Sequence, residues 1–377
     1  MELLKNPDRN SWGKIIQRPM QYNTGLEQAV AQILAQVESG GDQALKALTT
    51  KYDGIENVQL CMEVGLEEPE LTDQLKQAIK AAYRNIHNFH LSQKTAPNPV
   101  ETAPGVKCWR RSTPIETVGL YVPGGTAPLF STLLMLGVPA QIAGCGEIVV
   151  CTPPQPDGTV HPAIIYTAQL LNIKKLYPIG GAQAIGAMAY GTETVPKVYK
   201  ILGPGNQYVT MAKQIVSQQV PIDFPAGPSE VAILADSKAN PDFIAADLLS
   251  QAEHGADSQV VLVTDSLSII ASVQHSLSQQ LESLPRKNIA QQALQQSKLV
   301  FFDQLETAME FINAYAPEHL ILNTEVADHW AAKVTNAGSV FLGAYTPESA
   351  GDYASGTNHT LPTNGNARMY AGVSLDT

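Results

Sequence analysis

Residues 250–259, SQAEHGADSQ, place an amide and an imidazole at the end of an expected helix. Gln251 and His254 are three residues apart, so they share one helical face, and Gly255 is expected to end the helix. The plain interpretation is a polar last turn, with His254 near the negative end of the helix dipole. The chemical interpretation is a pair of ligands for a metal ion, although glutamine is an uncommon ligand.

Two further polar clusters follow, in APEHLIL (316–322) and in the loop TPESAGDYASGTNHTLPT (346–363). Their polar residues include Glu318, His319, Glu348, Asp352 and His359. Taken singly, each has an ordinary explanation, such as a turn cap or a histidine satisfied at the start of a strand. Together, imidazole and carboxylate side chains supply what a divalent metal such as zinc binds. Two acid/base groups reaching one site would also suit two proton transfers.

Three expected strands end in glycine turns that lead into helices. These turns are VPGGTAP (122–128), IGGAQAIG (179–186) and LGPGNQYV (202–209). A tight turn at a helix N-terminus lets backbone N–H groups approach an anion. None of the turns is a GxGxxG motif and GxxxxGK[ST] is absent, so the standard dinucleotide and P-loop motifs are missing. Ordinary strand-to-helix turns remain an equal alternative for each of them.

Short β-branched runs alternate with helical patterns from residue 117 onward. The expected strands are ETVGLYV, EIVVC, KKLYPI, KVYKIL, VAILA, QVVLVT, KLVFF, HLILN and SVFLG. Segments between them, such as STLLMLGVPAQIA, have helical patterns. This alternation predicts an α/β protein with mostly parallel sheets, covered on both faces, in two units. The region before residue 117 is expected to be mostly helical, as in LEQAVAQILAQVESGGDQAL (26–45).

The composition of the 377 residues, 44% hydrophobic and 16% charged, fits a globular protein of two or three domains. A net charge of −11 without basic runs argues against nucleic-acid binding, which depends on Lys and Arg. The apolar stretches fall short of a membrane span and no secretory signal is visible, so a cytoplasmic protein is expected. The four cysteines, Cys61, Cys108, Cys145 and Cys151, form no CxxC pair and are expected to be reduced packing residues.

The polar clusters and the glycine turns together resemble the histidinol dehydrogenase family. The resemblance rests on SQAEHGADSQV, APEHL, AGSVFLG, TPESAGDYASGTNHTLPT, PAGPSEV, GLYVPGGTAPLFSTLLMLGVPA, GGAQAIGA and GPGNQYVT, spread over nearly the whole chain. It implies a homodimeric enzyme that oxidises L-histidinol through L-histidinaldehyde to L-histidine, with NAD and one Zn²⁺ per subunit. It also implies Rossmann-like units that bind the dinucleotide in a variant way, which explains the missing GxGxxG motif.

The resemblance assigns roles to the residues that match the family's motifs. It implies zinc ligation by Gln251, His254 and Asp352, and acid/base catalysis by Glu318 and His319. It implies substrate contacts from Ser229, Gln251, His254, His319, Asp352 and His359, and NAD contacts from Tyr121, Gln183 and Asn206. In the implied mechanism, His319 accepts a proton in each of the two oxidations and Glu318 activates the water that hydrates the aldehyde.

The resemblance also implies two nested units. An N-terminal arm (1–15) would precede a discontinuous α/β domain of residues 16–121 and 231–377 that carries the metal and catalytic residues, and residues 122–230 would form the inserted α/β domain. Family members continue past the position of GVSLDT (372–377) with a helical tail that supplies a fourth zinc ligand and a substrate-binding Glu to the partner subunit. No residue here fills those positions, which motivates one alternative, a non-catalytic NAD-binding or partner-binding protein on the same scaffold. A related amino-alcohol dehydrogenase is a second alternative, and a metal-dependent hydrolase, which would leave the glycine turns without a role, is a distant third.

Overall fold

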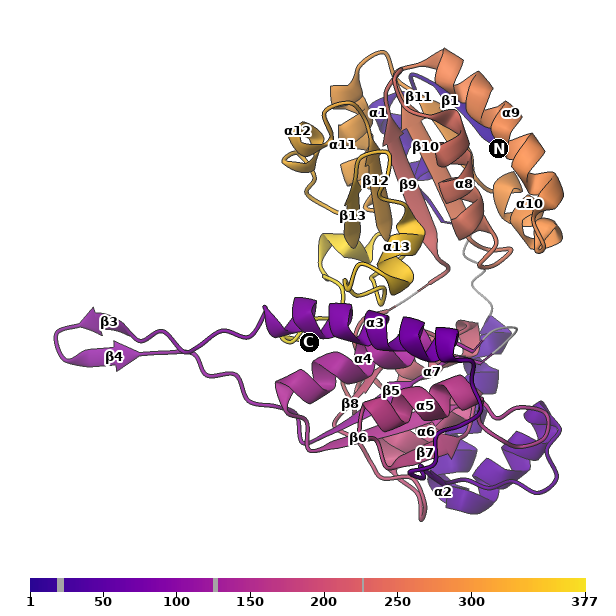
Figure 1. Ribbon diagram of the computed structural model, residues 1–377, viewed down its shortest axis with the longest axis vertical. Coiled ribbons are helices and arrows are strands. Elements are labelled where there is room, and N and C mark those ends of the chain that lie inside the picture. Colours follow the sequence, from indigo (N-terminus) through magenta and orange to yellow (C-terminus); the bar gives the residue numbers. More distant parts are fainter. Residues whose placement is uncertain (19–23, 125–127, 226) are drawn as a thin grey trace. The chain divides into compact units, whose positions relative to one another are not determined.

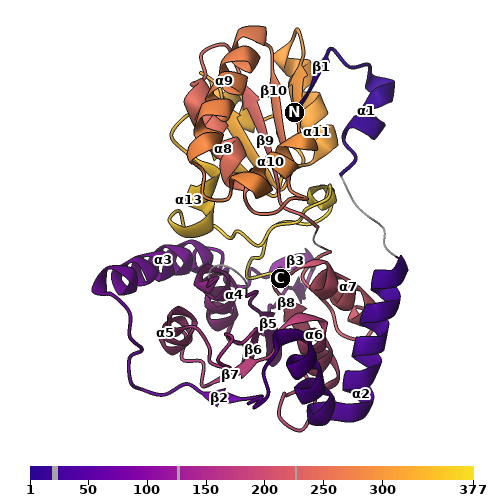
Figure 2. The ribbon, with the colours of Figure 1, turned by 90° about the vertical axis from the view of Figure 1, so that its right-hand side faces the viewer.

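The chain is divided into two compact units, each built around its own sheet. The computed structural model describes residues 1–18, 24–124, 128–225 and 227–377 (Figures 1 and 2). Unit 1 comprises residues 1–22, 226–352 and 361–372. Unit 2 comprises residues 23–225, 353–360 and 373–377. The glycine turn expected at 122–128 lies partly outside the described residues, as do residues 19–23 and 226.

Unit 1 contains a six-stranded sheet in which every pair of neighbouring strands is parallel. In spatial order its strands are β1 (Glu2–Lys5), β11 (Lys298–Phe301), β10 (Gln259–Thr264), β9 (Glu230–Ala235), β12 (His319–Asn323) and β13 (Ser339–Leu342). The three central strands, β10, β9 and β12, are buried along their whole length, which requires the continuous apolar runs that the sequence shows.

Helices cover both faces of this sheet. One face packs on α8 (Pro241–Ala252), α9 (Leu267–Ser283) and α10 (Lys287–Gln295); the other packs on α1 (Arg9–Ile15), α11 (Leu305–Tyr315) and α12 (Ala327–Ala331). The short helices α13 (Glu348–Tyr353) and η1 (Asn366–Arg368) follow the last strand. Asn240 caps the start of α8, and Pro241 stands in its first turn, where a missing N–H costs nothing.

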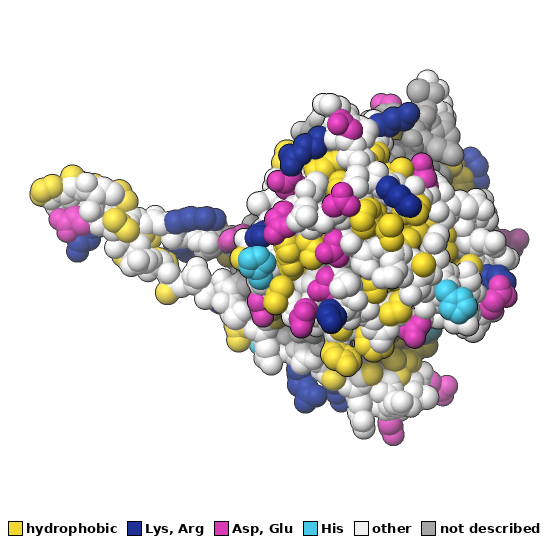
Figure 3. Space-filling view, turned by 90° about the horizontal axis from the view of Figure 1, so that it is seen from above, with side chains coloured by type: hydrophobic (Ala, Val, Ile, Leu, Met, Phe, Trp, Pro, Cys, Tyr) yellow, Lys and Arg dark blue, Asp and Glu magenta, His cyan; other side chains and the backbone are white. Residues whose placement is uncertain are grey.

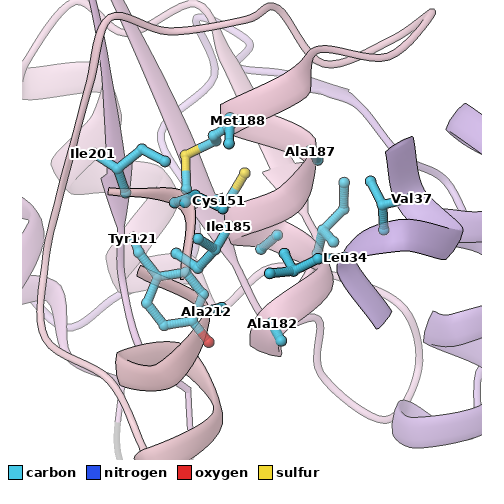
Figure 4. Packing of buried hydrophobic residues seen from close by; sticks show 14 of the residues in the cluster. Leu34, Val37, Tyr121, Cys151, Ala182, Ile185, Ala187, Met188, Ile201 and Ala212 are labelled. Carbon is cyan, nitrogen blue, oxygen red and sulfur yellow. The ribbon is translucent and has the colours of Figure 1, made fainter. Parts of the chain in front are cut away.

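Unit 2 contains a five-stranded sheet whose four longer strands are parallel. Its spatial order is β2 (Met62–Glu63), β7 (Lys175–Pro178), β6 (Glu147–Thr152), β5 (Thr117–Tyr121) and β8 (Lys200–Leu202), with β2 antiparallel. One face packs on α2 (Thr24–Asp53), α6 (Gly181–Tyr190) and α7 (Gln207–Val216), as the close view in Figure 4 shows for part of this core. The other face packs on α3 (Asp73–Leu91), α4 (Phe130–Ala143) and α5 (Pro162–Leu170).

A separate hairpin, β3 (Val100–Ala103) and β4 (Val106–Cys108), leaves the body of unit 2. Figure 1 shows it extending away from the sheet and helices of its own unit. Gly105 adopts a positive φ of 80° in its turn, a conformation that glycine accepts without strain. Every residue of both strands is exposed.

The predicted fold class is confirmed, since each expected strand and helix after residue 117 is present. The start of the chain differs from the expected arm and from the helical interpretation, because residues 2–5 pair with β11 as an edge strand. The division into units also differs from the expected boundaries. Residues 24–121 pack with the expected insert and not with the metal-carrying unit, because α2 and α3 cover the faces of a sheet that has β5 near its centre. Among the described helices, none has the length and hydropathy needed to cross a bilayer.

Candidate active site

The two predicted acid/base residues lie at the amino end of β12. Glu318 and His319 are only 6% and 5% exposed, so both polar side chains need partners inside the protein. The backbone of Glu230, which begins the neighbouring strand β9, provides them. Its N–H donates to Oε2 of Glu318 at 2.9 Å, and its carbonyl oxygen lies 3.0 Å from Nδ1 of His319.

The contact with Glu230 fixes the tautomer of His319. A carbonyl oxygen can only accept, so Nδ1 carries the ring proton and Nε2 keeps its lone pair. That Nε2 atom lies 3.8 Å from Oε1 of Glu348. Burial lowers the pKa of His319 below its usual value, although the charge of Asp352 opposes this. A neutral imidazole with a free Nε2 can accept a proton or bind a cation.

Three side chains converge as a possible metal site. One ligand atom each from His319, Glu348 and Asp352 lies within 4.8 Å of the other two. Glu348 and Asp352 are four residues apart on α13, so the helix turns both toward the same side. Glu348 belongs to the predicted polar cluster but has no role among the residues that the resemblance assigns; its spacing of four from Asp352 is the signal that would have paired the two on one helical face.

Gln251 is placed as a ligand would be, at the end of α8. Its side chain is 1% exposed, and neither its amide nitrogen nor its amide oxygen has a hydrogen-bond partner. Oε1 of the buried Glu348 also lacks a partner. A buried polar atom without a partner is costly, so these atoms are available as ligands for a bound group.

His254 lies one residue beyond the C-cap of α8 and is more exposed. Its Nδ1 lies 2.9 Å from the carbonyl oxygen of Ser250, which leaves Nε2 available as a ligand atom. His254 interacts electrostatically with both Glu348 and His319. It is therefore close to the converging side chains that come from α13 and β12.

Several carboxyl groups lie close together around this site, and burial disfavours their ionised form. Burial raises the pKa of Glu318 well above its usual value, and the charges of Glu348 and Asp352 add to this effect. Burial also raises the pKa of Glu348, and it raises the pKa of Asp247 to about 7. The nearby positive charges and hydrogen-bond donors therefore do not fully stabilise the ionised form of these carboxylates. A divalent cation would relieve their mutual repulsion, and imidazole, amide and carboxylate donors are suitable ligands for zinc.

Two of the predicted substrate contacts, Ser229 and His359, fall in different units. Ser229 directly precedes Glu230 in unit 1, and its carbonyl oxygen accepts from the N–H of Gln259. His359 belongs to the segment 353–360, which packs with unit 2. Its neighbour Asn358 anchors that segment by donating to the carbonyl of Met135 at 2.6 Å. Both substrate roles remain predictions.

The three predicted NAD contacts lie at the carboxyl edge of the sheet in unit 2. Tyr121 ends β5, Gln183 stands in the first turn of α6 after β7, and Asn206 caps α7 after β8. The chain leaves β5 toward β6 on one side, while β8 lies on the other. Such a switch point is where open parallel sheets bind dinucleotides. The sequence therefore selected residues along one edge, although their contacts with NAD remain predictions.

Tyr121 is more buried than a simple ligand contact would require. Figure 4 shows its ring within the core, near Ile185 and Ala212. Its hydroxyl oxygen accepts from the N–H of Gly181 at 3.0 Å, and burial raises the pKa of the phenol to about 12. The side chain of Tyr121 therefore connects β5 to the N-terminus of α6.

A buried ion pair holds the turn that follows β8. Nζ of Lys213 lies 2.5 Å from Oδ1 of Asp223 and donates to the carbonyl of Gly203 at 2.7 Å. The N–H of Gly203 donates to Oδ2 of Asp223 at 2.8 Å. Gly203 has a φ of 125°, and a Cβ there would collide with the backbone of Tyr121. The turn that leads to Asn206 is thus rigid and closely packed.

Comparisons with known proteins place the chain in a family. The family model described as histidinol dehydrogenase matches residues 16–377. Histidinol dehydrogenases from Bacteroides fragilis and Bacteroides thetaiotaomicron are 54% and 55% identical over 380 residues, covering 100% of this chain and 89% of each relative. The crystal structure of histidinol dehydrogenase from Elizabethkingia anophelis superposes with a TM-score of 0.96 at 53% identity, covering 100% of this chain and 88% of that one.

A more distant structure shares only the fold. An acetylating aldehyde dehydrogenase from Geobacillus thermoglucosidasius has a TM-score of 0.54 at 14% identity, covering 98% of this chain and 92% of that one. The family match spans most of the chain, and the two Bacteroides relatives are more than half identical over its whole length. The chain belongs to the histidinol dehydrogenase family.

Proposed function

We propose that this chain oxidises L-histidinol to L-histidine, with NAD as the hydride acceptor and one zinc ion in each subunit. The observation that carries the proposal is a group of donors in unit 1, in which ligand atoms of the buried His319 and Glu348 and of the half-buried Asp352 lie within 4.8 Å of one another. Membership of the family and the buried amide of Gln251 support the same conclusion.

Gln251, His254 and Asp352 are the proposed zinc ligands. A zinc ion held by these residues would supply positive charge that helps to bind and orient the substrate. The protein prepares this site by burying Gln251 without partners and by holding Nδ1 of His254 on the carbonyl of Ser250. The amide oxygen of Gln251 and Nε2 of His254 could therefore bind a metal without breaking an existing hydrogen bond.

His319 is the proposed base in both oxidations. Removal of a hydride from the alcohol requires loss of the hydroxyl proton, and Nε2 of His319 is the free acceptor. The lowered pKa of His319 keeps the ring neutral near pH 7, the state that a base requires. Glu318 is the proposed base that takes a proton from water when the aldehyde is hydrated. Its raised pKa makes the ionised carboxylate a stronger base.

The proposed NAD site is the carboxyl edge of the sheet in unit 2. NAD supplies the hydride acceptor when it is bound. The N-termini of α4, α6 and α7 follow β5, β7 and β8 at this edge and offer positive dipole ends to the phosphates. The closely packed turn at Gly203 fixes the backbone that the dinucleotide would approach.

A homodimer is proposed through the hairpin β3–β4. An isolated two-stranded hairpin is marginally stable in water, yet this one leaves Val100, Val106 and the following Trp109 about half exposed or more, at 56%, 49% and 60%. Figure 3 shows hydrophobic side chains on this projection, interspersed with acidic and basic ones. A second copy of the chain would cover the hairpin. Replacing Val100 and Val106 with Glu should yield monomers in analytical ultracentrifugation, and an unchanged dimer would contradict the proposed contact.

The activity is tested by incubating the full chain with zinc, NAD and L-histidinol. The expected result is two NADH formed for each histidine, since each oxidation removes one hydride. Other amino alcohols that lack an imidazole should be oxidised far more slowly, which separates this function from that of a related amino-alcohol dehydrogenase. A chain that binds NAD but forms no NADH with any of these substrates would support the non-catalytic alternative.

A further inference from the structure

Both members of the acid/base pair are held by the backbone of one residue, Glu230. Its N–H donates to Glu318 and its carbonyl accepts from His319. Glu230 begins β9, but the pairing between β9 and β12 starts one residue later, where Val231 lies opposite His319. The N–H and the carbonyl of Glu230 thus lie just beyond the residues that pair with β12. A contact other than β9–β12 pairing must therefore hold Glu230 on the side that faces β12.

The side chain of Glu230 is fixed by Arg18. Nη2 of Arg18 lies 2.6 Å from Oε2 of Glu230, and Nε lies 3.1 Å from Oε1, so the guanidinium binds both carboxylate oxygens. The N–H of Asn364 also donates to Oε1. The side chains of Arg18 and Glu230 are 7% and 1% exposed, which shields the ion pair from water.

Arg18 also binds the turn that leads to Glu318. Its Nη2 donates to the carbonyls of Tyr315 at 2.7 Å and Ala316 at 3.3 Å. The guanidinium lies over the ring of Tyr315, 3.7 Å from its centroid. Ala316 ends α11 in the left-handed conformation with a φ of 53°, and the chain reaches Glu318 two residues later. The guanidinium of Arg18 therefore connects Glu230, whose backbone orients Glu318 and His319, to the turn at Tyr315 and Ala316 that leads into them.

We propose that Arg18 and Glu230 are positioning residues for Glu318 and His319, an inference that rests on the proposed function. The ion pair fixes the backbone of Glu230, and the carbonyl of Glu230 keeps the proton of His319 on Nδ1 and leaves Nε2 as the acceptor. A displacement of about 1 Å from a productive geometry can lower a rate roughly 100-fold. An ion pair with only a structural role would change stability without changing the tautomer.

The test replaces Arg18 with Lys in the full chain, because Lys keeps the charge but cannot bind both oxygens in one plane. The first readout is kcat and KM for L-histidinol with the zinc-loaded protein. The second is the tautomer of His319, read from its ring nitrogen chemical shifts in the metal-free protein. We expect kcat to fall about 10- to 100-fold with KM changed by less than about threefold, and a mixture of tautomers.

Arg9→Lys is the matched control. Arg9 lies in the same N-terminal segment and pairs with Glu310 at the surface, so both readouts should remain those of the wild type. If Arg18→Lys does not fold, the double variant Arg18→Met/Glu230→Met replaces it, because removing both partners leaves no buried charge unpaired. The same two measurements are made on it, with the same expected results.

A wild-type rate and tautomer in these variants would overturn the proposal. A lower rate with the wild-type tautomer would also overturn it, since that combination indicates a general structural defect. Absence of histidinol oxidation by the wild-type chain would contradict the proposed function alone, because the tautomer of His319 is measured without substrate.

Discussion

Replacing Gln251 with Met should stabilise the metal-free protein and weaken zinc binding at the same time. Without metal, both amide atoms of this buried side chain lack partners, and an unsatisfied buried polar group costs about 1–3 kcal/mol. Met has a similar length and a similar helix propensity but no amide. The free energy of unfolding of the metal-free chain should therefore rise by about 1–3 kcal/mol, with Tm rising about 2–4 °C for each kcal/mol.

Two measurements on the same variant test this expectation. Thermal unfolding of chelator-treated protein, followed by circular dichroism, gives the stability, and zinc titration gives the affinity. Zinc affinity should fall by about 100-fold or more. Removing a residue that only hydrogen-bonds to a metal ligand already lowers affinity about 10- to 100-fold, and Gln251 is proposed to bind the metal directly. Gln274→Met, at an exposed position of α9, is the matched control and should change stability by less than about 0.5 kcal/mol. A Gln251→Met variant that is less stable without metal and binds zinc as tightly as the wild type would refute the reasoning.

Three further predictions concern the base, the NAD turn and pH. His319→Asn should lower kcat about 10²- to 10⁴-fold in the NADH assay while zinc remains bound in metal analysis; normal turnover would exclude His319 as the base. Lys213→Met should cost about 3–5 kcal/mol in urea unfolding, because Asp223 is left buried and unpaired, and should weaken NAD binding in fluorescence titration by loosening Gly203. Burial raises the pKa of Asp247 to about 7, so the folded metal-free chain holds a proton that the unfolded chain releases near pH 4. Stability should therefore fall as pH rises from about 4 to about 7, and Asp247→Asn should remove part of this fall; an identical pH profile in that variant would contradict the raised pKa.

The strands were predictable because their physical requirement is simple. A strand buried on both faces of a parallel sheet must be apolar throughout, and QVVLVT or HLILN meets that requirement within a few residues. The edge strand ELLK at residues 2–5 lacks this signal, since edge strands are short and largely exposed. Its pairing with β11 depends on residues almost 300 positions away, which no local pattern reveals.

The boundaries of the units were less accessible from the sequence. The amphipathic pattern of α2 and α3 shows that each helix buries one face, but not which sheet covers it. The same limit applies to residues 353–360, which pack with unit 2 although Asp352 belongs to unit 1. That crossing depends on particular tertiary contacts, such as the one between Asn358 and Met135.

The candidate site was predictable in part. The sequence predicted that Gln251 and His254 share one helical face, but α8 ends at Ala252, so His254 lies beyond the helix and its backbone N–H donates to the carbonyl of Gln251. The pairing of Glu348 with Asp352 was not predicted because the stretch around them, rich in Gly, Ser and Thr, suggested a loop, whereas the structure forms a short helix there. The role of Arg18 was inaccessible, since a lone arginine far from the motifs carries no sequence signal. Its meaning appears only when the fold brings it to Glu230.

The proposed metal site lies at the amino edge of the sheet in unit 1, whereas the proposed NAD site lies at the carboxyl edge of the sheet in unit 2. Helix dipoles give a physical reason for this difference. In a parallel sheet with helical crossovers, helices begin at the carboxyl edge and end at the amino edge. The proposed metal residues of unit 1 include Gln251, at the C-terminal end of α8, and they stand beside His319, at the amino end of β12. The negative end of a helix dipole favours a cation by about 0.3–1 kcal/mol.

The proposed NAD contacts of unit 2 lie instead where α6 and α7 begin, and the positive dipole ends there favour phosphate. Neither edge would serve the other ligand as well, because the sign of the dipole at each edge follows from the direction of the strands. A cation and a dinucleotide can therefore be bound by two units of the same architecture without any change of fold, provided that each unit places its polar side chains at the edge of matching sign.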